Sequence, residues 1–309
     1  MTSAVVFAYH DVGVKCLSVL LAHGVKVALV VTHEDNPAET LWFDSVTKLA
    51  AAHHVPTIAP DDPNTSDVVE RIGALKPDFL FSFYYRNMLK PALLSLPRCG
   101  ALNMHGSLLP KYRGRVPVNW AVIRGETETG ATLHYMTAKP DAGDIVAQRA
   151  VPILPDETAA EVMRKVADAA AALLDRIVPS LLTGTAPRVP QDLARGAYFG
   201  GRKPADGLID WQRTAREVHN LVRGVAPPYP GAFTMLGGKT LKILRTQAAA
   251  GDPPGVTPAI YADGTNCMAA CADGSLLRIL AMEYDGRSCS AADFLAQFGA
   301  APIPLEAAQ

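Results

Sequence analysis

An asparagine and a histidine two positions apart, Asn103 and His105, open the segment of this sequence that is best suited to chemistry. They stand at the end of a short apolar run, residues 101–104, which we predict to be a β-strand. Residues two apart on an extended strand share one face, so both side chains can converge on one small group. An amide can stabilise a developing oxyanion while an imidazole moves protons, a pairing that suits acyl transfer. Taken alone, such a pair is more often a strand-end turn with a histidine that is hydrogen-bonded to a backbone carbonyl.

Two longer motifs contain this pair. The first reads N-M-H-G-S-L-L-P-K-Y-R-G over residues 103–114, and the second reads D-A-G-D-I over residues 141–145. Their order and content are similar to the hallmark motifs of the 10-formyltetrahydrofolate-dependent formyltransferases. The resemblance implies that Asn103 stabilises the tetrahedral oxyanion and that His105 is the general acid/base. It further implies that Asp141 raises the pKa of His105, that 10-formyltetrahydrofolate is the formyl donor, and that no metal is needed.

The same resemblance implies two sets of binding residues. The folate would contact positions in three segments: Asn87, Met88 and Leu89, then Arg115, then Thr137, Ala138, Lys139, Pro140 and Asp141. The acceptor would contact three positions just after the first motif: Arg113, Asn119 and Trp120. A guanidinium can pair a phosphate through two parallel hydrogen bonds, which suits arginine to the anionic part of such an acceptor.

The identity of the acceptor is implied by similarity over longer segments, at residues 1–13, 32–37, 78–89, 105–120 and 125–134. They resemble the formyltransferase domain of the bifunctional polymyxin-resistance protein, which formylates UDP-4-amino-4-deoxy-L-arabinose for lipid A modification. We therefore expect a sugar-nucleotide acceptor, and that one in particular. The alternatives are a formyltransferase for a dTDP-linked 4-amino sugar, a methionyl-tRNA formyltransferase, a hydrolase that releases formate from the donor, and a non-catalytic α/β binding protein.

The elements that must position these residues alternate through the first half of the chain. Four short apolar runs predict strands: 4–9 and 26–32, both rich in valine, and 78–83 and 101–104. Four intervening segments predict helices: 12–23, 43–53, 66–75 and 87–96. Such alternation indicates βαβ units and a Rossmann-like, mostly parallel sheet with helices on both faces. Two further strands and a long helix are predicted at 129–136, 145–153 and 158–182, the helix opening on a capping box of Thr158 and Glu161.

The second half of the chain has a different character. We place a catalytic domain at residues 1–187, a Gly-, Pro- and Arg-rich linker at 188–204, and a β-rich C-terminal subdomain at 205–305. One helix, 214–225, precedes strand-like runs at 232–236, 239–245, 268–271 and 276–281. Short strands separated by Gly and Pro turns predict a small OB-like barrel.

Composition excludes several classes of protein. The 309 residues carry 29 Lys and Arg against 30 Asp and Glu, a formal net charge of −1 at pH 7. A protein that holds a long polyanion carries a basic excess, so we expect no nucleic-acid partner. The first predicted strand is followed by Y-H-D-V-G with a single glycine, which lacks the G-x-G-x-x-G turn of dinucleotide-binding proteins.

No segment of the sequence predicts a membrane span. Apolar stretches such as residues 25–31 reach only strand length, and the N-terminus has no basic and apolar leader. The 5 cysteines are scattered and complete no zinc-ligand spacing. We therefore expect a cytoplasmic protein with reduced thiols and no metal.

Overall fold

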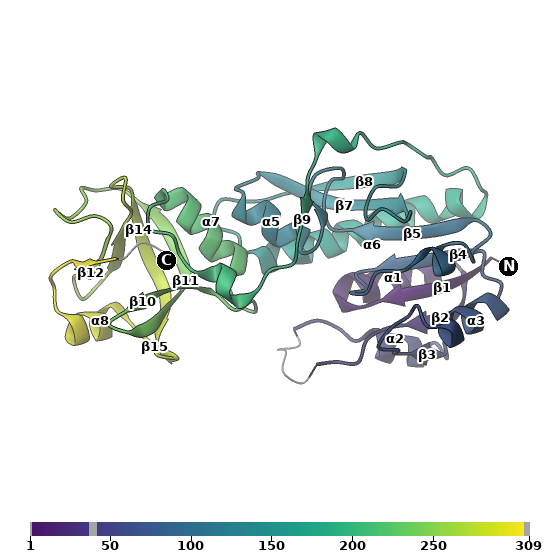
Figure 1. The fold of residues 1–309 in the computed structure, drawn as a ribbon, viewed down its shortest axis with the longest axis horizontal. Helices are drawn as coiled ribbons and strands as arrows, with labels where there is room; N and C mark the ends of the chain where they lie inside the picture. Colours follow the sequence, from purple (N-terminus) through teal and green to yellow (C-terminus); the bar gives the residue numbers. More distant parts are fainter. Residues whose placement is uncertain (1, 37–41, 306–309) are drawn as a thin grey trace. The chain divides into compact units, whose positions relative to one another are not determined.

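The computed structural model describes residues 2–36 and 42–305, and the chain divides into two compact units (Figure 1). The first comprises Met1–Pro117, Glu128–Pro152 and Met163–Gly200. The second comprises Val118–Thr127, Ile153–Val162 and Gly201–Gln309. Both units are therefore built from three separate stretches of the chain. The domain bounds predicted from the sequence stay a prediction.

A seven-stranded sheet forms the centre of the first unit. Its strands, in spatial order, are β3 (Thr57–Ile58), β2 (Lys26–Val31), β1 (Ser3–Ala8), β4 (Phe79–Phe83), β5 (Gly100–His105), β7 (Glu128–Tyr135) and β8 (Ile145–Pro152). The first five are parallel, while β7 and β8 are antiparallel to their neighbours. The predicted Rossmann-like, mostly parallel sheet is confirmed.

Helices flank this sheet (Figure 1): α1 (His10–Ala22), α2 (Val46–Ala52), α3 (Ser66–Ala74), α4 (Pro91–Leu94) and α6 (Ala159–Leu182). On one face, Val5 and Phe7 of β1 belong to a buried cluster with Ile72 of α3 and Leu93 of α4. The other face of β1 is buried as well, and the strand is therefore apolar at consecutive positions. Two side-chain contacts join α1 to the first-unit part of α6, an ion pair of Lys15 with Asp168 and a hydrogen bond between His23 and Asp175.

Most predicted elements are present. Where the bounds of a helix differ from the predicted bounds, the difference has a local cause. The capping box of α6 is confirmed, since the Thr158 N–H donates to Glu161 at 2.7 Å and the Glu161 N–H donates back at 3.3 Å. Helix α2 begins only at Val46, because the Ser45 hydroxyl caps it by accepting from the Lys48 N–H. The helix predicted at 87–96 is reduced to α4, which begins at Pro91.

A second antiparallel sheet makes up most of the second unit and curls into an open half-barrel, in agreement with the predicted small β-rich domain. Its order is β10 (Ala232–Leu236), β11 (Lys239–Ala249), β14 (Leu276–Tyr284), β13 (Cys267–Ala270), β12 (Ala259–Ala262) and β16 (Ile303–Pro304), with β15 (Arg287–Ser288) beside β14. The other described α-helices are α7 (Ala215–Val225), α8 (Ala291–Phe298) and α5 (Pro117–Ile123). Strand β12 and helices α5 and α8 were not predicted.

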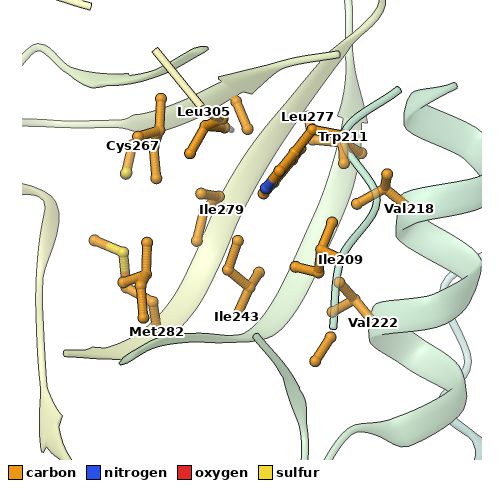
Figure 2. Close-up of a cluster of buried hydrophobic side chains, with 14 of the residues drawn as sticks. Ile209, Trp211, Val218, Val222, Ile243, Cys267, Leu277, Ile279, Met282 and Leu305 are labelled. Atoms are coloured by element: carbon orange, nitrogen blue, oxygen red, sulfur yellow. The ribbon is translucent and has the colours of Figure 1, made fainter. Parts of the chain in front are cut away.

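The core of this unit forms between α7 and the curled sheet. Figure 2 shows Val218 and Val222 of α7 beside Ile209, with Trp211 close to Leu277 of β14. Trp211 is fully buried, and its indole N–H donates to the Thr234 hydroxyl at 3.1 Å.

One buried guanidinium joins the three chain stretches of the second unit. Arg223 of α7 donates to the carbonyl oxygens of Val122 at 3.4 Å, Leu154 at 3.3 Å and Glu157 at 3.1 Å. A buried guanidinium is stable only when its donors are paired, so these contacts tie the two short stretches to α7.

Candidate active site

Asn103 and His105 lie on β5, between parallel β4 and antiparallel β7. In the ladder with β7, Asn103 is directly opposite His134 and His105 is opposite Thr132. The side chains of Asn103 and His105 share one face of the sheet, as the alternation of a strand requires. Both residues therefore lie at the C-terminal end of β5, next to the loop of the first motif.

The His105 imidazole is buried, with 6% of the residue exposed. Its Nε2–H donates to the Tyr112 carbonyl oxygen at 2.8 Å. Its Nδ1 lies 3.6 Å from Oδ1 of Asp141. The first motif thus folds back on its own histidine and fixes the orientation of the ring.

Asp141 is held both at its carboxylate and at its main-chain oxygen by residues of other segments. Its Oδ2 accepts from the Gly114 N–H at 2.8 Å. Its main-chain oxygen accepts from the Gln191 amide at 3.1 Å, and the same amide donates to the Gly143 oxygen at 2.6 Å. The backbone at Asp141 has φ +50°, a left-handed conformation that costs energy in a residue with a side chain. Residues in such conformations concentrate at functional sites.

The loop after His105 is fixed to β7 and β8 by hydroxyl and amide side chains. Thr132 donates to the Ser107 carbonyl oxygen at 2.6 Å and accepts from the Leu109 N–H at 3.1 Å. Gln148 of β8 donates to the Leu109 carbonyl oxygen at 2.8 Å. These contacts hold the loop rigidly against the strand opposite His105.

Burial determines the net direction of the His105 pKa. Burial disfavours the charged ring and lowers the pKa of His105 below its ordinary value of 6.5. The carboxylate of Asp141 and the carbonyl of Tyr112 both act to raise this pKa. The sequence led us to expect that Asp141 raises the pKa of His105. The carboxylate does act in that direction, but burial outweighs it.

Asp141 is ionised at neutral pH. Burial acts to raise the pKa of Asp141, but the imidazoles of His105 and His134, 3.6 Å and 3.5 Å from its Oδ1, act against it more strongly. The Gly114 N–H adds to these contacts, and the pKa of Asp141 lies well below its usual range.

His134 is part of this cluster, although the sequence did not point to it. It is 1% exposed, and its Nδ1–H donates to the Tyr135 carbonyl oxygen at 2.8 Å. Its Nε2 lies 3.2 Å from the Asn103 amide nitrogen and 3.5 Å from Oδ1 of Asp141. The signal that could have found it is the register of β5 and β7, which sequence alone does not fix.

The chain matches the family described as "Formyl transferase" over residues 15–178, which is more than half of its length. It also matches "Formyl transferase, C-terminal domain" over residues 202–299. The chain belongs to the formyl transferase family. It is an enzyme that transfers formyl groups, and the first match spans Asn103, His105 and Asp141.

Solved structures with the same fold include two described as N-formyltransferases and one described as HypX. An N-formyltransferase from Helicobacter canadensis is 20% identical with a TM-score of 0.71, the match covering 90% of this chain and 99% of that one. A sugar N-formyltransferase from a Shewanella species is 18% identical with a TM-score of 0.63, covering 79% and 96%. HypX from Aquifex aeolicus is 17% identical with a TM-score of 0.63, covering 98% of this chain and 48% of that one. At these identities the likeness shows the shared fold.

Arg113 and Arg115 of the formyltransferase differ in their surroundings. Arg113 is buried, and its guanidinium donates to the carbonyl oxygens of Leu193 at 3.3 Å and Gly196 at 3.2 Å. Arg115 is exposed, and its main-chain N–H donates to the Phe199 oxygen at 2.9 Å. Arg113 thus anchors the segment 189–200 to the first motif, while the side chain of Arg115 faces solvent.

The remaining predicted acceptor residues lie in the second unit. Asn119 is buried and donates to the Gly224 carbonyl oxygen at 2.9 Å. The ring of Trp120 has the guanidinium of Arg202 above it, 4.8 Å from the centroid. A role in acceptor binding stays a prediction for both residues.

Apart from Arg115, the predicted folate residues form two segments of the formyltransferase. After β4, the Asn87 amide donates to the Asp61 oxygen at 2.9 Å, the side chain of Met88 is 57% exposed, and Leu89 is buried. The second segment lies between β7 and Asp141 and consists of exposed Thr137, Ala138 and Lys139 with half-buried Pro140. Both segments therefore offer exposed side chains and backbone to a ligand.

Within residues 2–36 and 42–305, no group of three or more His, Cys, Asp or Glu side chains could hold a metal ion. Over the same ranges, no helix is both long enough and apolar enough to cross a bilayer.

Proposed function

We propose that this formyltransferase moves the formyl group of 10-formyltetrahydrofolate onto the amino group of a sugar nucleotide, and specifically onto UDP-4-amino-4-deoxy-L-arabinose. The observation that carries the proposal is the convergence of Asn103, His105 and Asp141 from two motifs onto one face of the sheet. An amide, an imidazole and a carboxylate in this arrangement are the groups that acyl transfer to an amine requires.

The formyl donor is supported by the residues around the catalytic groups. The donor supplies a formyl group activated by its attachment to an aryl-substituted nitrogen. Met88, Thr137 and Lys139 are exposed beside this part of the fold and would hold the folate. Solved relatives support the same donor, because the Helicobacter enzyme is described with folinic acid and HypX with tetrahydrofolic acid.

In the proposed reaction the amine nitrogen forms a bond to the formyl carbon, and the bond from that carbon to the donor nitrogen breaks. The amino group of Asn103 donates to the negative charge that develops on the formyl oxygen. His105 takes the proton of the attacking amine and returns it to the departing nitrogen. Because Nε2–H is already donated to Tyr112, the proton enters at Nδ1, beside the Asp141 carboxylate.

The acceptor class is supported by the descriptions of the relatives and by the long sequence resemblance. The Helicobacter relative is described with dTDP-3-aminofucose, and the Shewanella relative is described as a sugar N-formyltransferase. These descriptions favour a dTDP-linked amino sugar as the second candidate acceptor.

A competition assay tests the acceptor. UDP-4-amino-4-deoxy-L-arabinose, a dTDP-4-amino sugar and methionyl-tRNA are offered at equal concentration with 10-formyltetrahydrofolate, and kcat/KM is compared. We expect the UDP sugar to be preferred by more than about tenfold, which corresponds to roughly 1.4 kcal/mol. Preference for another acceptor would overturn the proposed identity of the acceptor, but it would not contradict the proposed formyl-transfer chemistry. Release of formate from the donor at an equal rate without any amine would instead identify a hydrolase.

A further inference from the structure

His134 is a buried histidine whose two ring nitrogens are both occupied. Its Nδ1–H donates to the Tyr135 carbonyl oxygen at 2.8 Å. In the neutral ring this leaves Nε2 as an acceptor, because only one ring nitrogen then carries hydrogen. The acceptor nitrogen lies 3.2 Å from the amide nitrogen of Asn103.

This contact determines which way the Asn103 carboxamide faces. The side chain of Asn103 is half-buried, and its amino group has two hydrogens, of which His134 accepts one. The second hydrogen remains for a ligand. If the carboxamide turned by half a rotation, its oxygen would take this place and repel an oxyanion instead of stabilising it.

The backbone supports the same orientation. Asn103 and His134 are direct partners in the antiparallel ladder of β5 and β7. The ladder of β7 with β8 is irregular between Leu133 and His134. Such irregularities redirect a side chain near an active site.

We propose that His134 is a positioning residue of this enzyme, which holds the amino group of Asn103 toward the reacting formyl oxygen. The proposal rests on the proposed function of Asn103 as the oxyanion donor. His134 itself touches neither substrate. It acts through a hydrogen bond that selects one of the two orientations of the carboxamide.

The first test compares two substitutions of His134. His134→Leu removes the acceptor, and we expect kcat to fall about 10- to 100-fold while both KM values stay within about twofold. His134→Gln keeps a side-chain acceptor, and we expect kcat within about fivefold of the native enzyme. Thr129→Val is the matched control, because Thr129 is also buried on β7 and its hydroxyl has no hydrogen-bond partner within the described residues. The control should leave kcat unchanged.

The second test is a double-mutant cycle with Asn103. If His134 acts through Asn103, adding His134→Leu to Asn103→Ala should cost less than about threefold more. A full additional loss in that background would overturn the proposal. The proposal would also be overturned if His134→Leu lowered kcat fully in the Asn103→Ala background but not in an Asp141→Asn background. His134 would then act through the carboxylate.

Two further outcomes separate this proposal from the proposed function. If Asn103→Ala retains native activity, the role of Asn103 fails and the positioning role fails with it. If Asn103→Ala is inactive while well-folded His134→Leu retains native kcat, only the positioning role fails. Should His134→Leu not fold, the Gln variant decides, since a folded His134→Gln enzyme with at least a 10-fold loss would contradict the proposal.

Discussion

At the scale of single residues, His105 receives opposing influences from its surroundings. Burial lowers its pKa, and the carboxylate of Asp141 raises it without restoring the ordinary value. A histidine with a lowered pKa is neutral at pH 7 and is ready to accept a proton. The nearby carboxylate then stabilises the imidazolium only in the moment when it forms.

The substitution Asp141→Asn tests this balance. Removing the charge removes an influence that raises the pKa of His105, so this pKa should fall further. Since the neutral imidazole is the active form, the acidic limb of kcat/KM should move to lower pH, and the plateau rate should also fall. The pH profile of kcat/KM between about pH 5 and 8 measures both effects. A lower plateau with an unmoved acidic limb would mean that Asp141 only shapes its loop.

Alanine at Asn103 or at His105 should abolish most formyl transfer and preserve the fold. Loss of one oxyanion donor costs about 10²- to 10³-fold in kcat, and loss of a general base costs about 10²- to 10⁴-fold. Steady-state kinetics and circular dichroism check these expectations together. A variant with native circular dichroism that keeps more than about half of its activity would contradict the assignment.

The sequence predicts part of this cluster, and the reason for the limit is geometric. Asn103 and His105 could be paired from strand alternation alone, because they are neighbours on one face. Asp141 was found only through the resemblance to a family, since a loop can return to a strand in many ways. His134 was missed because its position depends on the register of two strands distant in sequence.

At the scale of elements, the segment 189–200 supports the first motif from outside. The N–H groups of Arg113 and Arg115 donate to the carbonyl oxygens of Ala197 and Phe199, at 3.1 Å and 2.9 Å. β6 (Arg113–Gly114) and β9 (Tyr198–Phe199) form a small parallel pair through these bonds. The N–H of Gly114, between the two arginines, donates to Asp141, so residues 113–115 hold both the segment and the carboxylate.

Gly196→Ala should loosen this support. An added Cβ would lie 1.9 Å from the Pro110 carbonyl oxygen and 2.8 Å from the Lys111 nitrogen, and neither backbone atom can move aside cheaply. We expect the free energy of unfolding to fall by on the order of 1–3 kcal/mol and kcat to fall with it. Urea denaturation and steady-state kinetics measure the two quantities.

Gly200→Ala is the control within the same segment, because a Cβ there would have no heavy atom within 4 Å. It should change the free energy of unfolding by only a few tenths of a kcal/mol. Equal free energies of unfolding for Gly196→Ala and Gly200→Ala would contradict a tight packing of Gly196 against Pro110.

The elements themselves were predicted unevenly for identifiable reasons. Strands β1, β2 and β4 are buried on both faces, so their continuous apolar runs give a strong signal. Helix α5 was missed because it starts at Pro117, directly after an irregular motif that we read as loop. Helix α8 is short, and its capping box of Ser290 and Asp293 is the signal that could have found it.

At the scale of the whole molecule, the second unit has a core of its own centred on Trp211. Trp211→Ala should reduce the free energy of unfolding by about 3–5 kcal/mol, because the substitution leaves a large cavity in a fully buried site. Trp211→Phe keeps most of the packing but loses the hydrogen bond to Thr234, and should cost about 1–3 kcal/mol. Thermal or urea unfolding of both variants checks whether Trp211→Ala loses more free energy of unfolding than Trp211→Phe. Equal costs would mean that the hydrogen bond, and not the packing, stabilises this core.

The division of each unit into three stretches has a consequence during biosynthesis. The last residue of the first unit, Gly200, leaves the ribosome before any of the long third stretch of the second unit. Until then, residues 118–127 and 153–162 lack the guanidinium of Arg223, which binds the carbonyl oxygens of Val122, Leu154 and Glu157. When the nascent chain has just completed the first unit, these two segments of the second unit are therefore still without their partner. For the same reason, no single cut exchanges the second unit between relatives, because its two short stretches would have to be exchanged with it.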